Sequence, residues 1–328
     1  MSWKWISFGI LCLVLLFQYK NLMIKRIFIL FILVFFVSVS ASEERIFTHN
    51  ELERSYHLHI PQDLEDKAPL VVVIHGYTSA AENIMSYSKM NEVADREGFA
   101  VIYPQGTIDS QGNAFFNVGY EFNKDSKIDD VSFIRELVIH VRDTYQLSEK
   151  NIFATGMSNG GEMSYLLACT SSDLFKAVAP VAGVMMKETL DNCNPQNPIP
   201  VFEIHGTNDN ISFFQGDIEN KGGWGSYYGL PETIQFWADK HNLDKSEYIQ
   251  VSSKGAGAQN DIIFERHWSE DNVNEVWLYK IVDGGHVWPG FKIRWWQNPL
   301  LWYYMGSGNE DINASEEVWK FFKKFVSD

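Results

Sequence analysis

The segment around Ser158 constrains the fold more than any other part of the chain. An apolar run that we predict to be a strand, Asn151–Thr155, leads into Gly156-Met157-Ser158-Asn159-Gly160, and a predicted helix, Gly160–Cys169, follows. A strand–turn–helix unit of this kind holds a serine on a sharp turn at the edge of a sheet. Its glycines are required because a side chain there would clash with the neighbouring strand and helix. We therefore predict that Ser158 is a nucleophile; the alternative is a glycine-rich helix start that Ser158 merely caps.

The rest of the chain alternates predicted strands and helices. Predicted strands lie at Ser55–Ile60, Pro69–Ile74, Phe99–Tyr103, Ala177–Val181, Val201–Ile204 and Val276–Val282. Helical spacing of apolar residues is found in Asp129–Tyr145, Pro231–His241 and Ala314–Val326. This alternation predicts an α/β fold with a mostly parallel central sheet and helices on both faces. We expect one domain over residues 42–328. Hydrophobic residues make up 45% of the chain, which excludes a disordered protein.

The first 41 residues differ from the remainder because they contain four basic residues and no acidic residue. Lys25 and Arg26 precede the apolar run Ile27–Val37, and Val39-Ser40-Ala41 offers the small residues of a cleavage site. This is the pattern of a secretory signal peptide, so we expect a secreted or periplasmic protein. Met23 stands just before the pattern and is the expected true start. The alternative is a membrane anchor made of two short apolar segments.

Charge and cysteine content restrict the partners of the mature chain. The chain has 27 basic and 42 acidic residues, so cleavage after Ala41 would change its formal net charge from −15 to −19. Such an acidic protein is not expected to bind nucleic acid, which requires a basic face. Cleavage would also leave two cysteines, Cys169 and Cys193. In an exported protein, two cysteines favour a disulfide; two free buried thiols are the alternative.

A serine nucleophile needs a base and a carboxylate that orients this base. Asp209 follows the predicted strand Val201–Ile204, and His286 follows the predicted strand Val276–Val282. Both therefore lie at carboxyl ends of strands, where open α/β sheets carry their functional groups. The order serine, acid, histidine along the chain is the order expected with this type of nucleophile turn.

Other residues compete less well for these two roles. Asp217 and Asp239 are the rival acids, and His267 is the rival base. We interpret His205 as structural, because it lies only four residues before Asp209 and at a strand end.

The reaction also needs donors for the negative charge that develops on a carbonyl oxygen. The backbone N–H of Asn159, directly after the nucleophile, is one predicted donor. The backbone N–H of Tyr77 is the other, because Gly76 allows the loop after Ile74 to turn its amides inward. We expect the Tyr77 ring, Trp288, Trp295 and Trp296 to contact substrate. The alternative for the aromatic residues after Gly290 is that they pack onto the domain.

Taken together, the chain resembles a known enzyme family over roughly residues 50–328. The motifs that carry the resemblance are Leu70–Tyr77, Tyr103–Gly106, Asp129–Val131 with Phe133, Gly156–Gly161, Pro180–Gly183, His205–Thr207 with Asp209, and Gly285-His286 with Trp288–Gly290. They are similar to those of secreted α/β-hydrolases of the polyhydroxybutyrate-depolymerase-like and feruloyl-esterase-like type (carbohydrate esterase family 1).

The resemblance implies the α/β-hydrolase fold and the triad Ser158, Asp209 and His286. It also implies a Cys169–Cys193 disulfide, since relatives often carry a pair at these places. The chain departs from the family pattern at His241-Asn242-Leu243, where many relatives have a cysteine, and in the aromatic segment after Gly290.

These observations predict a secreted serine esterase that cleaves feruloyl or acetyl esters of plant polysaccharide through an acyl-enzyme. A monomer without cofactor or metal is sufficient for this chemistry, and no membrane insertion is expected once the leader is removed. An extracellular polyester depolymerase of the polyhydroxybutyrate type would use the same catalytic residues. A carbohydrate-binding or acyl-transferring protein on the same fold is the alternative of another class.

Overall fold

A ten-stranded sheet organises the structure, a computed structural model that describes residues 44–251, 261–270, 272–291, 305–306 and 308–328. The order across the sheet is β1-β2-β4-β3-β7-β8-β9-β12-β11-β10. The strands are β1 (Glu44–His49), β2 (Leu52–His59), β3 (Leu70–Ile74), β4 (Ala100–Pro104), β7 (Ile152–Met157), β8 (Ala177–Val181), β9 (Val201–Gly206), β10 (Lys245–Val251), β11 (Ile262–Ser269) and β12 (Asn272–Ile281). A separate two-stranded ribbon joins β5 (Thr107–Ile108) to β6 (Ala114–Phe115).

The middle of the sheet is parallel and its two edges are antiparallel. Strands β4, β3, β7, β8, β9 and β12 pair in parallel. The β1–β2 hairpin extends the sheet at one edge and the β10–β11 pair extends it at the other, both antiparallel. Because the central strands run in parallel, the loops that follow β3, β7, β9 and β12 all leave from the same edge of the sheet.

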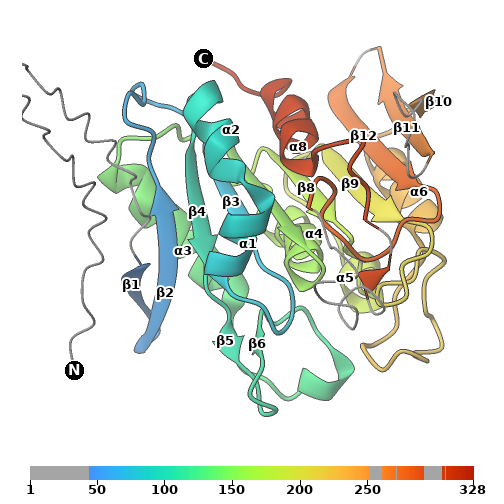
Figure 1. Ribbon diagram of the computed structural model, residues 1–328, viewed down its shortest axis with the longest axis horizontal. Helices are drawn as coiled ribbons and strands as arrows, with labels where there is room; N and C mark the ends of the chain where they lie inside the picture. The colour runs from blue at the N-terminus through green and yellow to red at the C-terminus, as the bar shows by residue number, and fades with distance from the viewer. Residues whose placement is uncertain (1–43, 252–260, 271, 292–304, 307) are drawn as a thin grey trace, which may run out of the picture. The chain divides into compact units, whose positions relative to one another are not determined.

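Helices cover both faces of the sheet, as Figure 1 shows. On one face, α1 (Ala81–Ser88), α2 (Met90–Glu97) and α8 (Ala314–Lys323) pack against alternate residues of the strands, such as Val71 and Val73. On the other face, α3 (Asp130–Thr144), α4 (Asn159–Thr170) and α6 (Leu230–Lys240) pack against the intervening residues, such as Val72 and Ile74. A short helix, α5 (Lys187–Asp191), and a 3-10 turn, η1 (Glu121–Asn123), lie in the loops. The expected α/β architecture with two covered faces is confirmed.

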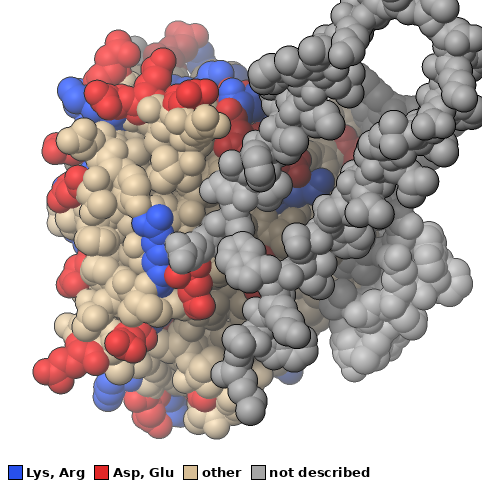
Figure 2. Space-filling view, turned by 60° about the vertical axis from the view of Figure 1, so that its left-hand side comes forward, with Lys and Arg blue, Asp and Glu red and all other residues tan. Residues whose placement is uncertain are grey.

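Charged side chains are distributed over the surface, and some predicted features lie outside the described residues. On the face drawn in Figure 2, acidic and basic side chains lie interspersed around a broad area of uncharged residues. Within the part of the chain that is described, no helix has both the length and the apolar character needed to cross a bilayer. The predicted leader 1–41, including Met23 and the cleavage site at Ala41, and the predicted substrate contacts Trp295 and Trp296 lie outside the described residues.

Candidate active site

Ser158 occupies a strained turn between β7 and α4. Its backbone has φ 57° and ψ −121°, a region that side-chain-bearing residues rarely adopt and that costs about 1–3 kcal/mol. The turn is held because the N–H of Ser158 donates to Val181 O at 2.9 Å and its carbonyl accepts from Glu162 N–H at 2.9 Å. Ser158 is half-buried, whereas every other residue from Asn151 to Tyr165 is buried. The turn therefore presents one side chain, the predicted nucleophile, at the surface of the sheet edge.

The glycines on either side of Ser158 are required by contacts with β3. A Cβ atom on Gly160 would lie 2.0 Å from Ile74 O, and a Cβ atom on Gly156 would lie 2.6 Å from the same oxygen. Neither distance is possible for real atoms, so helix α4 can lie this close to the sheet only with glycine at both positions. This geometry agrees with the steric reason that the sequence suggested for the motif.

Asp209 and His286 come together in the loops after β9 and β12. The ring Nδ1–H of His286 donates to Asp209 Oδ2 at 2.7 Å, and both side chains are buried. The other carboxylate oxygen, Asp209 Oδ1, accepts the N–H groups of Ile211 and Ser212, each at 2.8 Å. Burial by itself would raise the pKa of Asp209, but attraction to His286 and hydrogen bonds from His205 and His286 hold this pKa well below its ordinary value. Asp209 therefore stays ionised and fixes the tautomer of His286.

The rival acids and the rival base have other partners. Asp217 accepts the N–H groups of Lys221 and Gly222 at 2.9 and 2.7 Å, so it closes a surface turn. Asp239 accepts from Gln235 one turn earlier on α6. His267 bonds to Glu265 at 2.7 Å on β11. These contacts give each of the three a structural role.

The predicted oxyanion donors lie on both sides of Ser158. Asn159 is the first residue of α4, so its N–H has no acceptor within the helix. Its side chain both accepts from Phe116 N–H at 2.7 Å and donates to Phe116 O at 3.0 Å, which fixes the loop in front of the helix. On the other side, a Cβ atom on Gly76 would lie 3.3 Å from Ser158 Cβ. Tyr77, the next residue, therefore begins its loop beside the nucleophile.

Four aromatic rings form a cluster that begins at Tyr77. The Tyr77 ring lies 6.1, 5.6 and 5.5 Å from the rings of Tyr120, Phe122 and Trp224, with edge-to-face geometry. Tyr120 is buried beneath the other three, which are half-buried. The Tyr77 hydroxyl donates to Asp109 at 2.7 Å, which fixes its ring. Sequence reasoning singled out only Tyr77 of the four, because Tyr120 and Phe122 belong to the turn around η1 and Trp224 to a third segment of the chain.

Trp288 occupies a different environment from the expected one. Its exposed fraction is 1%, and its ring centroid lies 6.3 Å from that of the half-buried Tyr87. A ring enclosed to this degree has no face open to a ligand. The expectation that Trp288 lines the cleft is therefore corrected: Trp288 lies on the same loop as His286 and packs into the core, against Tyr87 of α1.

Glu162 is a buried carboxyl group that sequence reasoning missed. It lies on α4, one helical turn after Ser158, and its side chain is hydrogen-bonded to the hydroxyl of Tyr120. Burial raises the pKa of Glu162 to about 7, although hydrogen bonds from Tyr120 and Asn159 oppose this effect. This carboxyl anchors the buried ring of the aromatic cluster to the nucleophile helix. A glutamate inside an otherwise small and apolar helix start is the sequence signal that could have identified it.

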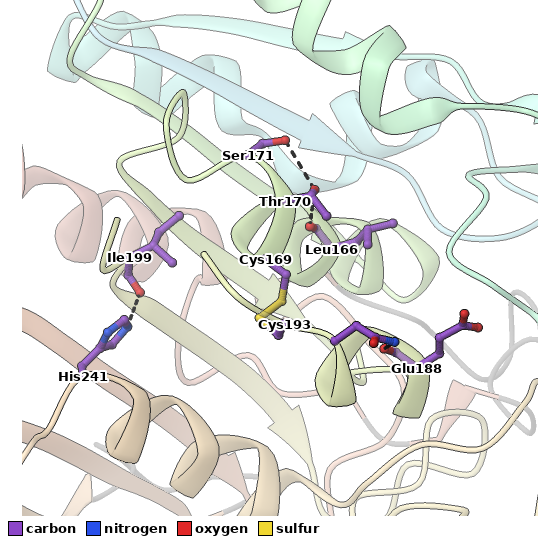
Figure 3. Close-up of a disulfide and its surroundings, with 9 residues drawn as sticks. Leu166, Cys169, Thr170, Ser171, Glu188, Cys193, Ile199 and His241 are labelled. Atoms are coloured by element: carbon purple, nitrogen blue, oxygen red, sulfur yellow. Dashed lines mark hydrogen bonds between the residues drawn. A yellow bond between two sulfur atoms is a disulfide. The ribbon is translucent and has the colours of Figure 1, made fainter. Parts of the chain in front are cut away.

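A disulfide ties the end of the nucleophile helix to the segment after α5. Cys169 and Cys193 are bonded, with Cα atoms 4.9 Å apart (Figure 3). Cys169 lies in α4 and Cys193 between α5 and β9, so the pair closes a loop of the chain that contains β8 and α5. The structure thus contains the disulfide that the family resemblance implied.

Comparison with known proteins identifies relatives of this site. A family model described as esterase PHB depolymerase matches residues 54–235, more than half of the chain. A putative esterase, NocK, of Nocardia uniformis subsp. tsuyamanensis is 26% identical over 72% of this chain and 71% of its own length. Feruloyl esterase B of Piromyces equi is 30% identical over 52% of this chain, and the match spans 32% of that protein, about a third of its length.

One solved structure supports the fold. An acetyl xylan esterase from Aspergillus awamori aligns with 80% of this chain and 100% of its own chain, with a TM-score of 0.53 and 16% identity. At this level of identity the likeness shows a shared α/β-hydrolase fold.

Proposed function

This chain belongs to the esterase PHB depolymerase family, and we propose that it is a secreted serine esterase. The observation that carries the proposal is the buried hydrogen bond between Asp209 and His286 at the sheet edge that also presents Ser158. A carboxylate that orients a histidine, at the same sheet edge as a serine on a strained turn, is the arrangement that supports activation of serine for acyl transfer.

The reaction follows from the positions of these groups. His286 takes the proton of the Ser158 hydroxyl while Ser158 attacks the ester carbonyl carbon. The N–H groups of Tyr77 and Asn159 stabilise the oxygen that becomes negative. His286 then gives the proton to the leaving alcohol, and a water molecule cleaves the acyl-enzyme by the same steps in reverse order. Asp209 stabilises the charged form of His286 throughout.

Replacement of the nucleophile tests the proposal directly. Ser158→Ala should lower hydrolysis of p-nitrophenyl acetate by about 10⁵-fold or more without changing the circular dichroism spectrum. Ser164→Ala is the matched control, because Ser164 lies on the same helix and donates to Gly160 O at 2.8 Å. It should keep most of the activity. Retention of activity in Ser158→Ala would refute the role of this serine.

The aromatic cluster favours an ester of an aromatic acid, such as a feruloyl ester on a polysaccharide. Tyr77 belongs both to the proposed oxyanion loop and to the cluster, so an acyl group bound at Ser158 would lie beside the half-buried rings of Phe122 and Trp224. Edge-to-face and offset contacts with an added aromatic ring contribute about 0.5–1.5 kcal/mol beyond the area that they bury.

Trp224→Ala should therefore lower kcat/KM for methyl ferulate by about 3- to 10-fold relative to p-nitrophenyl acetate. Trp268→Ala is the control, since Trp268 is also half-buried but lies on β11, at the end of the hairpin remote from the catalytic loops. An equal loss on both esters in Trp224→Ala would favour a purely structural role for the cluster.

A polyester depolymerase is the second candidate, and the family model that matches residues 54–235 supports it. The two candidates differ in the substrate and not in the catalytic groups. Release of hydroxy acid from polyhydroxybutyrate film, with no cleavage of methyl ferulate, would decide for the polyester.

The signal-peptide pattern supports export, and amino-terminal sequencing of the exported protein tests it: a start at Met1 with no cut near Ala41 would contradict it.

A further inference from the structure

A second buried histidine contacts the same carboxylate oxygen as His286. His205 lies near the end of β9 and has an exposed fraction of 1%. Its Nε2 is 3.4 Å from Asp209 Oδ2 and 2.8 Å from the carbonyl oxygen of Ser212. Its Nδ1 is 2.9 Å from Glu203 Oε1. Asp209 is therefore placed between two imidazole rings, and Glu203 lies on the far side of the second ring.

The partners of His205 fix its protonation state. A neutral imidazole offers one N–H donor and one acceptor nitrogen. Nε2 faces a carbonyl and a carboxylate oxygen, so it carries hydrogen, and Nδ1 carries hydrogen when Glu203 is ionised. Burial raises the pKa of Glu203, whereas the hydrogen bond and the charge of His205 oppose this effect. Burial would lower the pKa of His205, but hydrogen bonds to Asp209 and Glu203 and the attraction of their charges raise it to about 10. We therefore expect both ring nitrogens to carry hydrogen at neutral pH.

We propose that His205 is a protonated positioning residue of the catalytic site, which holds Asp209 in place and weakens the hold of Asp209 on the proton of His286. This inference rests on the proposed esterase function. His205 does not touch the substrate; it acts through Asp209, because its positive charge partly balances the carboxylate that faces His286.

The charge balance gives the direction of the effect. Loss of the His205 charge leaves Asp209 with His286 as its remaining histidine neighbour among the described residues, so the Asp209 carboxylate favours a proton on that ring more strongly. His286 would then be protonated, and inactive as a base, up to a higher pH. Other titratable groups that lie around Asp209, Glu203 and His205 are the same in the wild type and in a variant of His205. They are Glu162 and Tyr165 on α4, Tyr227 before α6, and Lys280, which lies opposite His205 in the parallel register of β9 and β12.

The pH profile of a His205→Gln variant tests the proposal. The acid limb of kcat/KM should move to higher pH by about one unit. At its optimum, kcat should fall by about 10-fold while KM changes little, because the ordering of the base is impaired and not the binding of substrate. His241→Gln is the matched control: His241 is also buried, and its Nε2 donates to Ile199 O at 2.8 Å away from the triad (Figure 3). Its profile should coincide with that of the wild type.

A measurement that does not depend on activity completes the test. In the wild-type protein with ¹⁵N-labelled histidine, the His205 ring should show two protonated nitrogens at pH 8, assigned through bonds to the backbone. A neutral His205 ring at pH 8 would overturn the proposal, as would an unshifted acid limb in a folded His205→Gln protein. If the wild type cleaves no ester, the proposed function fails, and the spectrum still decides the protonation of His205.

Discussion

Asp130 and Asp209 are both buried carboxylates with a nitrogen partner at 2.7 Å, yet their pKa values move in opposite directions. Asp130, the first residue of α3, accepts from the Arg54 guanidinium at 2.7 Å and from Asn117 N–H at 2.7 Å. Burial raises its pKa, in spite of the attraction of Arg54. Asp209 is buried to a similar degree, but its pKa is lowered.

The number of partners accounts for this difference. Asp209 accepts two backbone N–H groups and lies within 3.4 Å of two histidine rings. Among the described residues, Asp130 has one cation and one backbone N–H as partners, which do not offset the loss of water around a charge. A buried carboxyl group thus has a lowered pKa only when several hydrogen-bond donors surround it. We expect the first carboxylate to matter for folding and the second for catalysis.

The largest effect is expected from replacement of Asp209, the carboxylate that we assign to catalysis. Asp209→Asn should lower kcat by about 10⁴-fold, because an amide no longer enforces the tautomer of His286 or stabilises its charged form. Ester hydrolysis by the purified variant measures this loss. Asp217→Asn is the control, since Asp217 is a buried aspartate that closes a turn. Near-normal turnover of Asp209→Asn together with a loss in Asp217→Asn would exchange the two assignments.

Much of this arrangement could be predicted from the sequence, because it depends on local patterns. The motif at Ser158 and the strands before Asp209 and His286 are continuous in the chain, and the parallel sheet brings their ends to one edge. Edge strands were harder to find: β10 has exposed Tyr248 and Ile249 and no clean alternation of apolar residues.

The rest depends on contacts between residues that are far apart in the chain. Arg54 and Asp130 are 76 residues apart, so no sequence window contains both. Of the two neighbouring aspartates at the start of α3, Asp129 caps the helix by accepting from Ser132 N–H, whereas Asp130 forms the buried ion pair. The role of Trp288 was misjudged because nearness to His286 in sequence does not show which way a ring faces.

Removal of the Arg54 guanidinium disrupts the buried ion pair at Asp130. Arg54→Met leaves a buried carboxylate without its cation, which should lower the free energy of unfolding by about 3–5 kcal/mol. Urea denaturation at pH 7 measures this change. The double variant Arg54→Met/Asp130→Asn should recover most of the loss, because the uncompensated charge is gone. Activity per folded molecule should remain that of the wild type; a large drop in folded Arg54→Met would contradict a purely structural role.

Glu162 extends the comparison to a buried carboxyl group that, among the contacts of the described residues, has a hydroxyl and an amide as partners and no cation. Its pKa is raised to about 7 in the folded protein from an ordinary value of 4.5. Between these two pH values the folded chain binds more protons than the unfolded chain, so stability falls as the pH rises through this window.

Glutamine carries no charge at any pH and removes this loss. Glu162→Gln should therefore match the wild type near pH 4 and be more stable than the wild type at pH 8 by about 2 kcal/mol, as measured by urea denaturation at both values. Glu188→Gln, at an exposed position on α5, should show the pH dependence of the wild type. A gain for Glu162→Gln that is equal at pH 4 and pH 8 would mean that this carboxyl group does not titrate in the window, and that its bond to Tyr120 is enough to offset burial.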